Sequence, residues 1–140
     1  MTTRFLAAVS LASLSLAGCT TMNDDAMGGA SPMAAADIPQ ATGYFAVDST
    51  LPFHAPDFTK ISEDDYIPAF EQGMAIHRAE VKAITANPAA PTFDNTIVAL
   101  EKSGAELGRV SRVFYALTGA NTTDRLDAID EEISPKLSAH

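Results

Sequence analysis

The chain has 140 residues, with 18 acidic and 9 basic side chains and a formal net charge of −9 at pH 7. No nucleic-acid partner is expected, because binding to phosphates by counterion release needs an excess of lysine and arginine. A single cysteine excludes a disulfide framework or a thiolate metal cluster within the chain. The length suits one small domain or a part of a larger one.

The first residues have the layout of a secretory signal. Arg4 supplies a positive charge, residues 5–17 are apolar apart from serines, and small residues precede Cys19. The motif LAGC at residues 16–19 resembles the lipobox of bacterial lipoproteins, in which the cysteine is lipidated and the signal is removed. We therefore expect residues 1–18 to be a lipoprotein signal peptide and Cys19 to be lipidated, with an ordinary signal peptide and a chance cysteine as the alternative.

Lipidation predicts a membrane anchor, since each buried methylene of an acyl chain adds about 0.8 kcal/mol of binding. Thr20 stands where an aspartate would, by resemblance to known lipoproteins, retain the protein in the inner membrane. The expected location is the cell envelope, in the outer membrane facing the periplasm. Residues 19–50 lack helical or strand periodicity and are rich in small residues, so they are predicted to be a flexible tether.

The first predicted helix begins after Ser62 and ends at Asn87. Ser62 can accept a backbone N–H, and the acids at residues 63–65 complement the positive end of the helix dipole. Pro68 lies about one turn inside, which predicts a separate short first turn. Apolar or semi-apolar residues then follow at helical spacing: Ile67, Phe70, Met74, His77, Val81 and Ile84.

A second helix is predicted from an N-cap at Thr92 to a stop at Gly119. Gly104 and Gly108 each cost about 1 kcal/mol relative to alanine in a helix interior. Such small residues one turn apart predict the close approach of another backbone. The residues that line one face of this helix are Ile97, Leu100, Gly104, Leu107, Val110 or Ser111, Phe114 and Leu117.

A third helix is predicted after a cap within residues 121–123, with Leu126, Ile129 and Ile133 on its apolar face and Leu137 as a further candidate for that face. Pro135 is expected to kink or end it. No strand pattern of comparable strength is present. Residues 51–140 are therefore predicted to be all-α, with about three helices.

No catalytic or metal-binding pattern is found in these helices. Zinc peptidases need two histidines four residues apart with a glutamate between them, the H-E-x-x-H motif. None of His54, His77 and His140 is four residues from another. His77 falls on an apolar face, where a packed histidine is more common than a metal ligand. A G-x-S-x-G elbow and a glycine-rich phosphate loop are also missing. The residues alone indicate a lipid-anchored helical module without a visible active site.

Residues 51–140 nevertheless resemble the N-terminal region of the thimet-oligopeptidase family of zinc metallopeptidases, which includes bacterial peptidyl-dipeptidases. The resemblance is carried in order by LPFHAPDF, YIPAFEQGM, NPAAPTFDNTIVALEKSG, RVSRVF, LTGANT and SPKLSAH. Family members look like two mostly helical lobes around a deep channel, with zinc held by a helix that carries H-E-x-x-H and by a downstream glutamate. No position of this chain matches that motif, so no catalytic or zinc residue is carried over.

The resemblance implies a helical N-terminal segment of a larger two-lobed fold, truncated before the catalytic region and expected to pack against the missing C-terminal region. The implied function is that of a non-catalytic portion of a zinc metallopeptidase that removes dipeptides from the C-termini of short peptides. Zinc is implied for the full-length family and none for this chain. The alternative is a small helical lipoprotein without enzymatic activity that binds a partner or peptide through exposed helix faces.

Overall fold

The computed structural model describes residues 38–140, and within that range the regular elements are all helical. The all-α prediction is confirmed. The predicted signal peptide and Cys19 lie outside the described residues. The helices are α1 (Tyr66–Thr85), α2 (Ala99–Lys102), α3 (Ala105–Asn121) and α4 (Asp124–Ala139), with a π-helical segment η5 (Phe93–Val98) before α2. Three short 3-10 turns are η2 (Tyr44–Ala46), η3 (Pro52–His54) and η4 (Glu63–Asp65).

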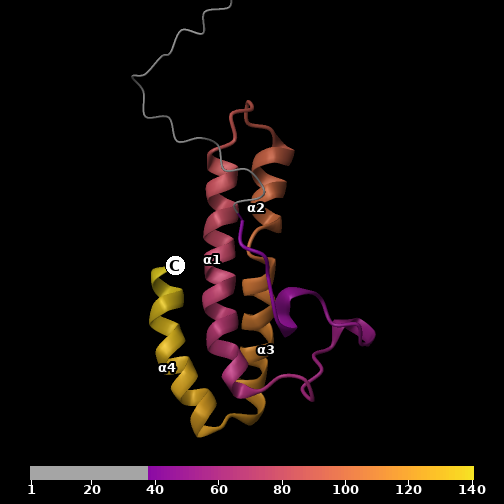
Figure 1. The fold of residues 1–140 in the computed structure, drawn as a ribbon, viewed down its shortest axis with the longest axis vertical. Helices are drawn as coiled ribbons and strands as arrows, with labels where there is room; N and C mark the ends of the chain where they lie inside the picture. Colours follow the sequence, from indigo (N-terminus) through magenta and orange to yellow (C-terminus); the bar gives the residue numbers. More distant parts are fainter. Residues whose placement is uncertain (1–37) are drawn as a thin grey trace, which may run out of the picture.

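The long helices lie side by side with α1 in the centre; α3 runs antiparallel to α1, and α4 runs in the same direction as α1 (Figure 1). α3 runs back along one side of α1, and this pair makes the most extensive contact between elements. α4 runs along the other side of α1 but reaches only about half-way up it (Figure 1). In the described part of the chain, no helix has the length and apolar character that crossing a bilayer requires.

The core lies where α1, α3 and α4 come together, and it contains most of the apolar positions that the helical spacing predicts. The rings of Tyr66 and Phe70 both pack edge-on against Phe114, with centroid distances of 5.0 and 5.3 Å. Such edge-to-face pairs add about 0.5–1.5 kcal/mol each to the free energy of area burial. The buried cluster is Phe45, Tyr66, Phe70, Val110, Phe114, Leu126, Ile129 and Ile133.

The predicted helix starts are confirmed. Ser62 and Asp65 form a reciprocal capping box, and the separate η4 turn precedes α1 as Pro68 predicted. The Thr92 hydroxyl accepts a hydrogen bond from the Asn95 backbone N–H, over 3.1 Å. Thr123 caps α4 in the same way. Each cap satisfies a backbone N–H that the first turn leaves without a partner.

The second predicted helix is not continuous, because the chain breaks its helical path at Gly104. Gly104 has φ +71°, in the left-handed region, and it separates α2 from α3. Its backbone N–H donates to the Glu80 carboxylate over 2.7 Å. A Cβ at Gly104 would lie 3.1 Å from the ring of His77. Glycine is therefore needed here for its backbone conformation and its small size.

The prediction that another backbone comes close at Gly104 and Gly108 was wrong. The close approach occurs at Gly73 instead. A Cβ on Gly73 of α1 would lie 3.0 Å from Cα of Leu107 on α3. At Gly108 the nearest atom is the end of the Arg112 side chain, at 3.1 Å. Gly73 therefore sets the separation of α1 and α3.

Two predicted helix ends also differ from the structure. α3 continues through Gly119 to Asn121, since Gly119 keeps a right-handed backbone. α4 continues through Pro135 to Ala139. Pro135 has no N–H, so the backbone carbonyl of Glu131 loses its intrahelical donor. Glu131 is exposed, and water can donate to that carbonyl instead. Packing of the helix on both sides of the proline then outweighs the loss.

The packed part of the chain begins before residue 51, where the tether was expected to end. Phe45 is 3% exposed and belongs to the core. The Arg109 guanidinium of α3 donates to the backbone carbonyls of Phe45 and Ala46, both over 2.8 Å. The pair Tyr44–Phe45 is thus an anchor within a stretch of small residues. We refer to residues 44–57 as the lead-in.

Candidate functional site

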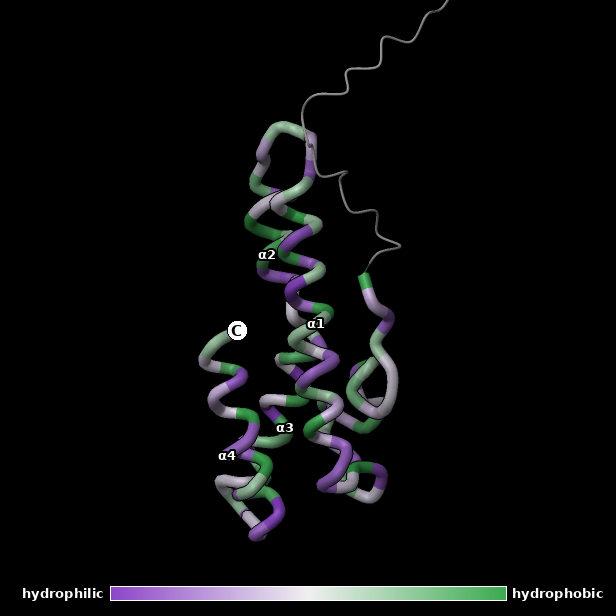
Figure 2. Tube along the Cα trace, turned by 60° about the vertical axis from the view of Figure 1, so that its left-hand side comes forward, coloured by the Kyte–Doolittle hydropathy of each residue, from purple (hydrophilic) through white to green (hydrophobic). Residues whose placement is uncertain are grey.

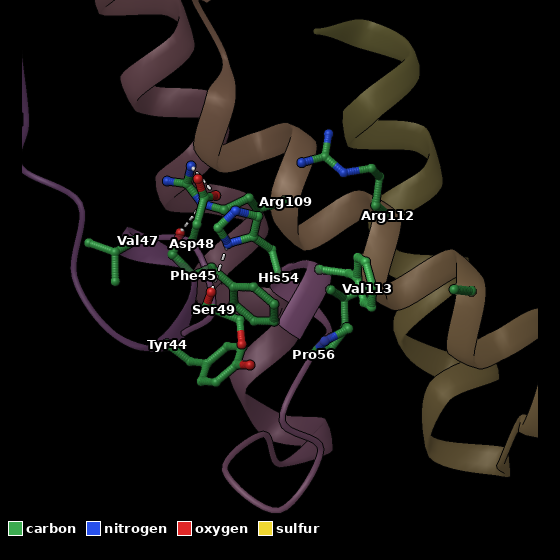
Figure 3. A pocket seen from close by; sticks show the side chains of 12 residues that line it. Tyr44, Phe45, Val47, Asp48, Ser49, His54, Pro56, Arg109, Arg112 and Val113 are labelled. Carbon is green, nitrogen blue, oxygen red and sulfur yellow. Dashed lines mark hydrogen bonds and ion pairs between the residues drawn. The ribbon is translucent and has the colours of Figure 1, made fainter. Parts of the chain in front are cut away.

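A pocket of about 360 Å³ lies between the lead-in and α3 (Figure 3). α3 supplies the side chains of Arg109, Arg112, Val113 and Ala116, and the lead-in supplies aromatic, apolar and histidine side chains. The two arginines are one helical turn apart, so they project from the same side of α3. A volume above 300 Å³ is in the range of small-molecule sites. The pocket is therefore the candidate site within residues 38–140.

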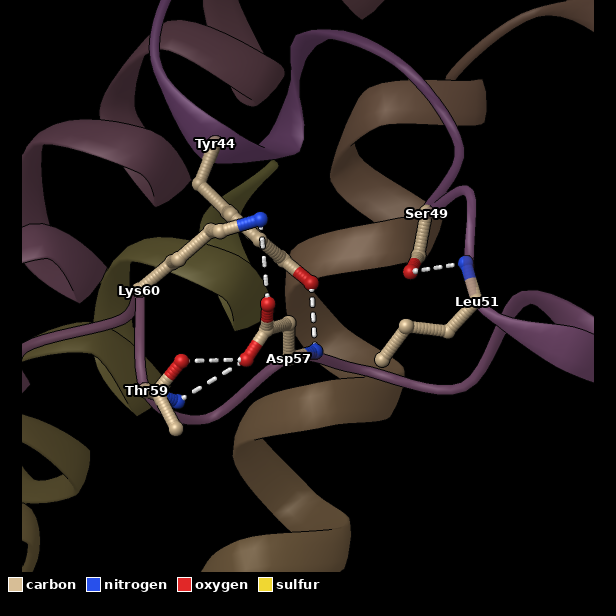
Figure 4. A network of polar contacts seen from close by, with 6 residues as sticks. All are labelled: Tyr44, Ser49, Leu51, Asp57, Thr59 and Lys60. Carbon is tan, nitrogen blue, oxygen red and sulfur yellow. Dashed lines mark hydrogen bonds and ion pairs between the residues drawn. The ribbon is translucent and has the colours of Figure 1, made fainter.

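The wall of the pocket is held by polar contacts at the end of the lead-in (Figure 4). The Tyr44 hydroxyl accepts a hydrogen bond from the Asp57 backbone N–H, over 2.6 Å. The Asp57 carboxylate accepts from the Thr59 hydroxyl over 2.6 Å and pairs with Lys60 at 3.1 Å. The hydrogen bonds from Thr59 and then Lys60 lower the pKa of Asp57 from its ordinary value. This turn fixes the Tyr44 ring beside the pocket.

The rim of the pocket contains a turn with an unfavourable backbone conformation. Phe53 and His54 have φ of +60° and +56°, and the Phe53 side chain is fully exposed. Left-handed conformations of non-glycine residues cost about 1–3 kcal/mol each. Nδ1 of His54 lies 2.8 Å from the carbonyl oxygen of Ser49. Because a carbonyl only accepts, Nδ1 of His54 donates in this hydrogen bond.

The two arginines of the pocket have different roles. The Arg109 guanidinium is occupied by the backbone carbonyls of the lead-in and by an ion pair with Asp48 at 3.4 Å. Arg112 is exposed, and no ion pair found within residues 38–140 involves it. One nitrogen of its guanidinium lies 3.1 Å from the position that a Cβ on Gly108 would take. Arg109 thus builds the wall, and Arg112 supplies an uncompensated positive charge.

A second exposed feature lies on η5 and α2, near the top of Figures 1 and 2. Phe93, Ile97 and Leu100 are 71, 52 and 52% exposed. Their spacing of four and three residues places them along one helical stripe. Ile97 and Leu100 were placed on the apolar face of the second predicted helix, and in the structure this part of the face is half exposed. We call these three residues the apolar stripe.

The three histidines are placed in two different parts of the structure. His54 lines the pocket, whereas Nδ1 of His77 lies 3.0 Å from Nε2 of His140. Burial, followed by the charges of His77 and Arg78, lowers the pKa of His140. His77 packs against Gly104, in agreement with its predicted place on an apolar face.

The zinc that the resemblance implies finds no suitable ligand set in this part of the chain. Within residues 38–140 no group of three or more histidine, cysteine, aspartate or glutamate residues is arranged to hold a metal ion. The residues described therefore do not fit a zinc centre.

The sequence reasoning did not identify the residues that build the pocket. The pair Arg109 and Arg112 was visible only as two cations one turn apart on the polar side of a predicted helix. Spacing of that kind usually indicates a solvated face. The pocket forms because Arg109 contacts the lead-in. That contact joins residues more than sixty positions apart in the sequence.

Comparisons with known proteins show what most of the chain is similar to. Dipeptidyl carboxypeptidase of Escherichia coli K12 is 51% identical over 94 residues, and that of Salmonella typhimurium LT2 is 50% identical over 91 residues. Over this stretch the chain is homologous to dipeptidyl carboxypeptidase. The predicted resemblance is confirmed. No protein-family model matches the chain.

The homology covers most of this chain and little of its relatives. The matched residues are 67 and 65% of this chain but only 14 and 13% of the two dipeptidyl carboxypeptidases. Such short coverage is consistent with the expected correspondence to an N-terminal segment of that kind of protein.

Proposed function

We propose that residues 38–140 are a helical scaffold segment of a dipeptidyl carboxypeptidase-like protein and do not perform its chemistry. The observation that carries this proposal is the 51% identity over 94 residues to a protein of that name. The reaction proposed for the whole protein is the removal of dipeptides from the C-termini of short peptides, with zinc as the metal. Zinc would be held by residues other than 38–140, since these contain no suitable group.

The distribution of apolar side chains supports a role within a larger protein. The core buries its apolar residues almost completely, whereas the apolar stripe leaves three large side chains more than half exposed. Contiguous exposed apolar residues mark an interface more often than a free surface. We propose that the rest of a peptidase packs against the stripe.

An exchange experiment tests this proposal. The matched segment of the E. coli enzyme is replaced by the corresponding residues of this chain, and the release of C-terminal dipeptides is measured. The chimera is expected to keep activity, because a scaffold segment of about half-identical sequence should pack in the same way. A folded but inactive chimera would contradict the scaffold role and favour the small-lipoprotein alternative.

The apolar stripe provides a second arm for the same experiment. Serine replacements at all three stripe positions should lower the activity or the yield of the chimera. A matched variant with serine at three exposed polar positions, Lys82, Glu101 and Lys102, should behave like the unaltered chimera. Equal activity of both variants would show that nothing packs on the stripe.

We also propose that Cys19 carries a lipid that anchors the chain in the outer membrane, facing the periplasm. The support is the LAGC motif and the apolar stretch that precedes it. Metabolic labelling with a fatty-acid analogue should mark the wild type and leave Cys19→Ala unmarked. Equal labelling of the two would remove the proposal.

A further inference from the structure

We infer that the pocket between the lead-in and α3 binds a small organic carboxylate with an apolar body. The site is separate from the scaffold role proposed above, and its ligand would be recognised by charge and by apolar contact together. The pocket volume of about 360 Å³ suits a molecule of roughly ten heavy atoms or somewhat more.

The charge of the pocket favours an anion. Asp48 is paired with Arg109, so these two charges largely offset each other. Arg112 then remains as the uncompensated charge at the pocket, in a chain whose net charge is −9. A guanidinium presents a planar fork of donors that matches both oxygens of a carboxylate. A carboxylate is thus an anion whose geometry Arg112 fits, and the apolar lining of the pocket favours an organic acid over the strongly hydrated phosphate that the same fork also fits.

The rest of the pocket favours an apolar body attached to that anion. Val113 and Ala116 line it from α3, while Val47 and Phe53 line it from the lead-in and are 71 and 102% exposed. A ligand placed between them would remove both exposed side chains from water. Each such side chain contributes about 1.5–3 kcal/mol when fully buried.

The backbone conformation at the rim supports binding at this place. Phe53 and His54 keep left-handed conformations although Phe53 has no buried contact of its own. Strain of this kind persists where the surroundings fix it, and it clusters at ligand sites. The His54–Ser49 hydrogen bond of 2.8 Å is one contact that fixes it. Phe53 and Arg112 thus line the same pocket, one from each wall.

The test is a titration of the full-length, isotope-labelled chain with 3-phenylpropionate, followed by the NMR shifts of its backbone amides. Saturable shifts are expected in the lead-in and in α3 around Arg112. The neutral amide, 3-phenylpropionamide, and acetate are expected to bind at least about tenfold more weakly, because each lacks one of the two recognised features. A blocked peptide ending in phenylalanine distinguishes a polypeptide carboxyl terminus from a free acid as the source of the group.

Two variants and one control complete the experiment. Arg112→Gln should weaken binding by about tenfold or more, since a hydrogen-bonded charge pair is lost. Lys102→Gln removes one positive charge from an exposed position outside the pocket and should leave binding unchanged. Phe53→Gly removes the apolar rim at a backbone conformation that glycine adopts easily, so the fold is retained while binding falls. Equal binding of the acid and its amide, or equal effects of Arg112→Gln and Lys102→Gln, would overturn the inference.

Discussion

Alanine at Gly73 is expected to destabilise the protein relative to alanine at Gly108. Both glycines lie in helices, so both replacements gain about 1 kcal/mol of helix propensity. They differ in what the new methyl group meets. At Gly73 it would lie 3.0 Å from Cα, 3.1 Å from the backbone nitrogen and 3.2 Å from Cβ of Leu107. At Gly108 it would lie 3.1 Å from the end of Arg112, which can swing away.

The magnitude follows from this comparison. Relief of the contact at Gly73 requires α1 and α3 to move apart, and overpacking of this type costs about 1–3 kcal/mol. Because the propensity gain is common to both variants, it cancels in their difference. Gly73→Ala is therefore expected to be about 1–3 kcal/mol less stable than Gly108→Ala. The free energy of unfolding of Gly108→Ala is expected to exceed that of the wild type by up to about 1 kcal/mol.

Urea unfolding followed by circular dichroism measures both free energies, and thermal melts provide a second readout. For a domain of about this size, 1 kcal/mol corresponds to a shift of about 4–8 °C in Tm. Equal stability of the two variants would refute the reasoning, because it would show that α1 and α3 separate without cost. A stability order with Gly73→Ala above Gly108→Ala would refute it more strongly.

Three further results are expected. Arg109→Met should lower the free energy of unfolding by about 1.5–3 kcal/mol in urea titrations, because it removes two charged hydrogen bonds to the lead-in, whereas Arg112→Met should have little effect. The pKa of His140 is lower in the folded chain than its ordinary value of 6.5, so the unfolded chain binds the His140 proton more readily. The free energy of unfolding should therefore fall as the pH drops below 6.5, and it should fall less in His140→Gln. Urea midpoints measured at neutral and at mildly acidic pH test this. The wild type should bind a hydrophobic dye more strongly than the variant with serine at the three stripe positions, and equal fluorescence would contradict an exposed stripe.

The elements and most core positions of this fold could be predicted because their signals are local. Ser62, Thr92 and Thr123 precede apolar residues at helical spacing, and each begins a helix in the structure. The period of Phe70, Val110 and similar residues identifies the buried faces directly. These features depend on neighbours within one or two turns, which a sequence shows.

The break at Gly104 could not be predicted because its causes lie on another helix. The helical period runs through Gly104 without interruption, so the sequence indicates one long helix. The left-handed conformation is stabilised by the Glu80 carboxylate, and His77 leaves no room for a side chain. Pro135 shows the opposite case, since tertiary packing carries α4 through a residue that usually ends a helix.

The pocket was missed for a related reason. Its construction depends on Arg109 holding Phe45 and Ala46 against α3, and both residues fall within residues 19–50, which were assigned to a tether because small residues dominate their composition. Tyr44 and Phe45 are the two aromatic residues of that stretch. An aromatic pair in a low-complexity stretch is a usable signal, because burying one such ring offsets the ordering of several residues.

The exposed apolar stripe follows from how the helices are layered. Along the half of α1 that contains Tyr66 and Phe70, α3 and α4 lie on either side, and three helices enclose a core (Figure 1). Along the other half, α2 lies beside α1, and no third helix of residues 38–140 covers this pair (Figure 1). Two helices can bury the faces that meet each other but not a second apolar face. The packing of the rest of a peptidase on the stripe, as proposed above, would cover it, and the matched segment is only 14% of the E. coli dipeptidyl carboxypeptidase.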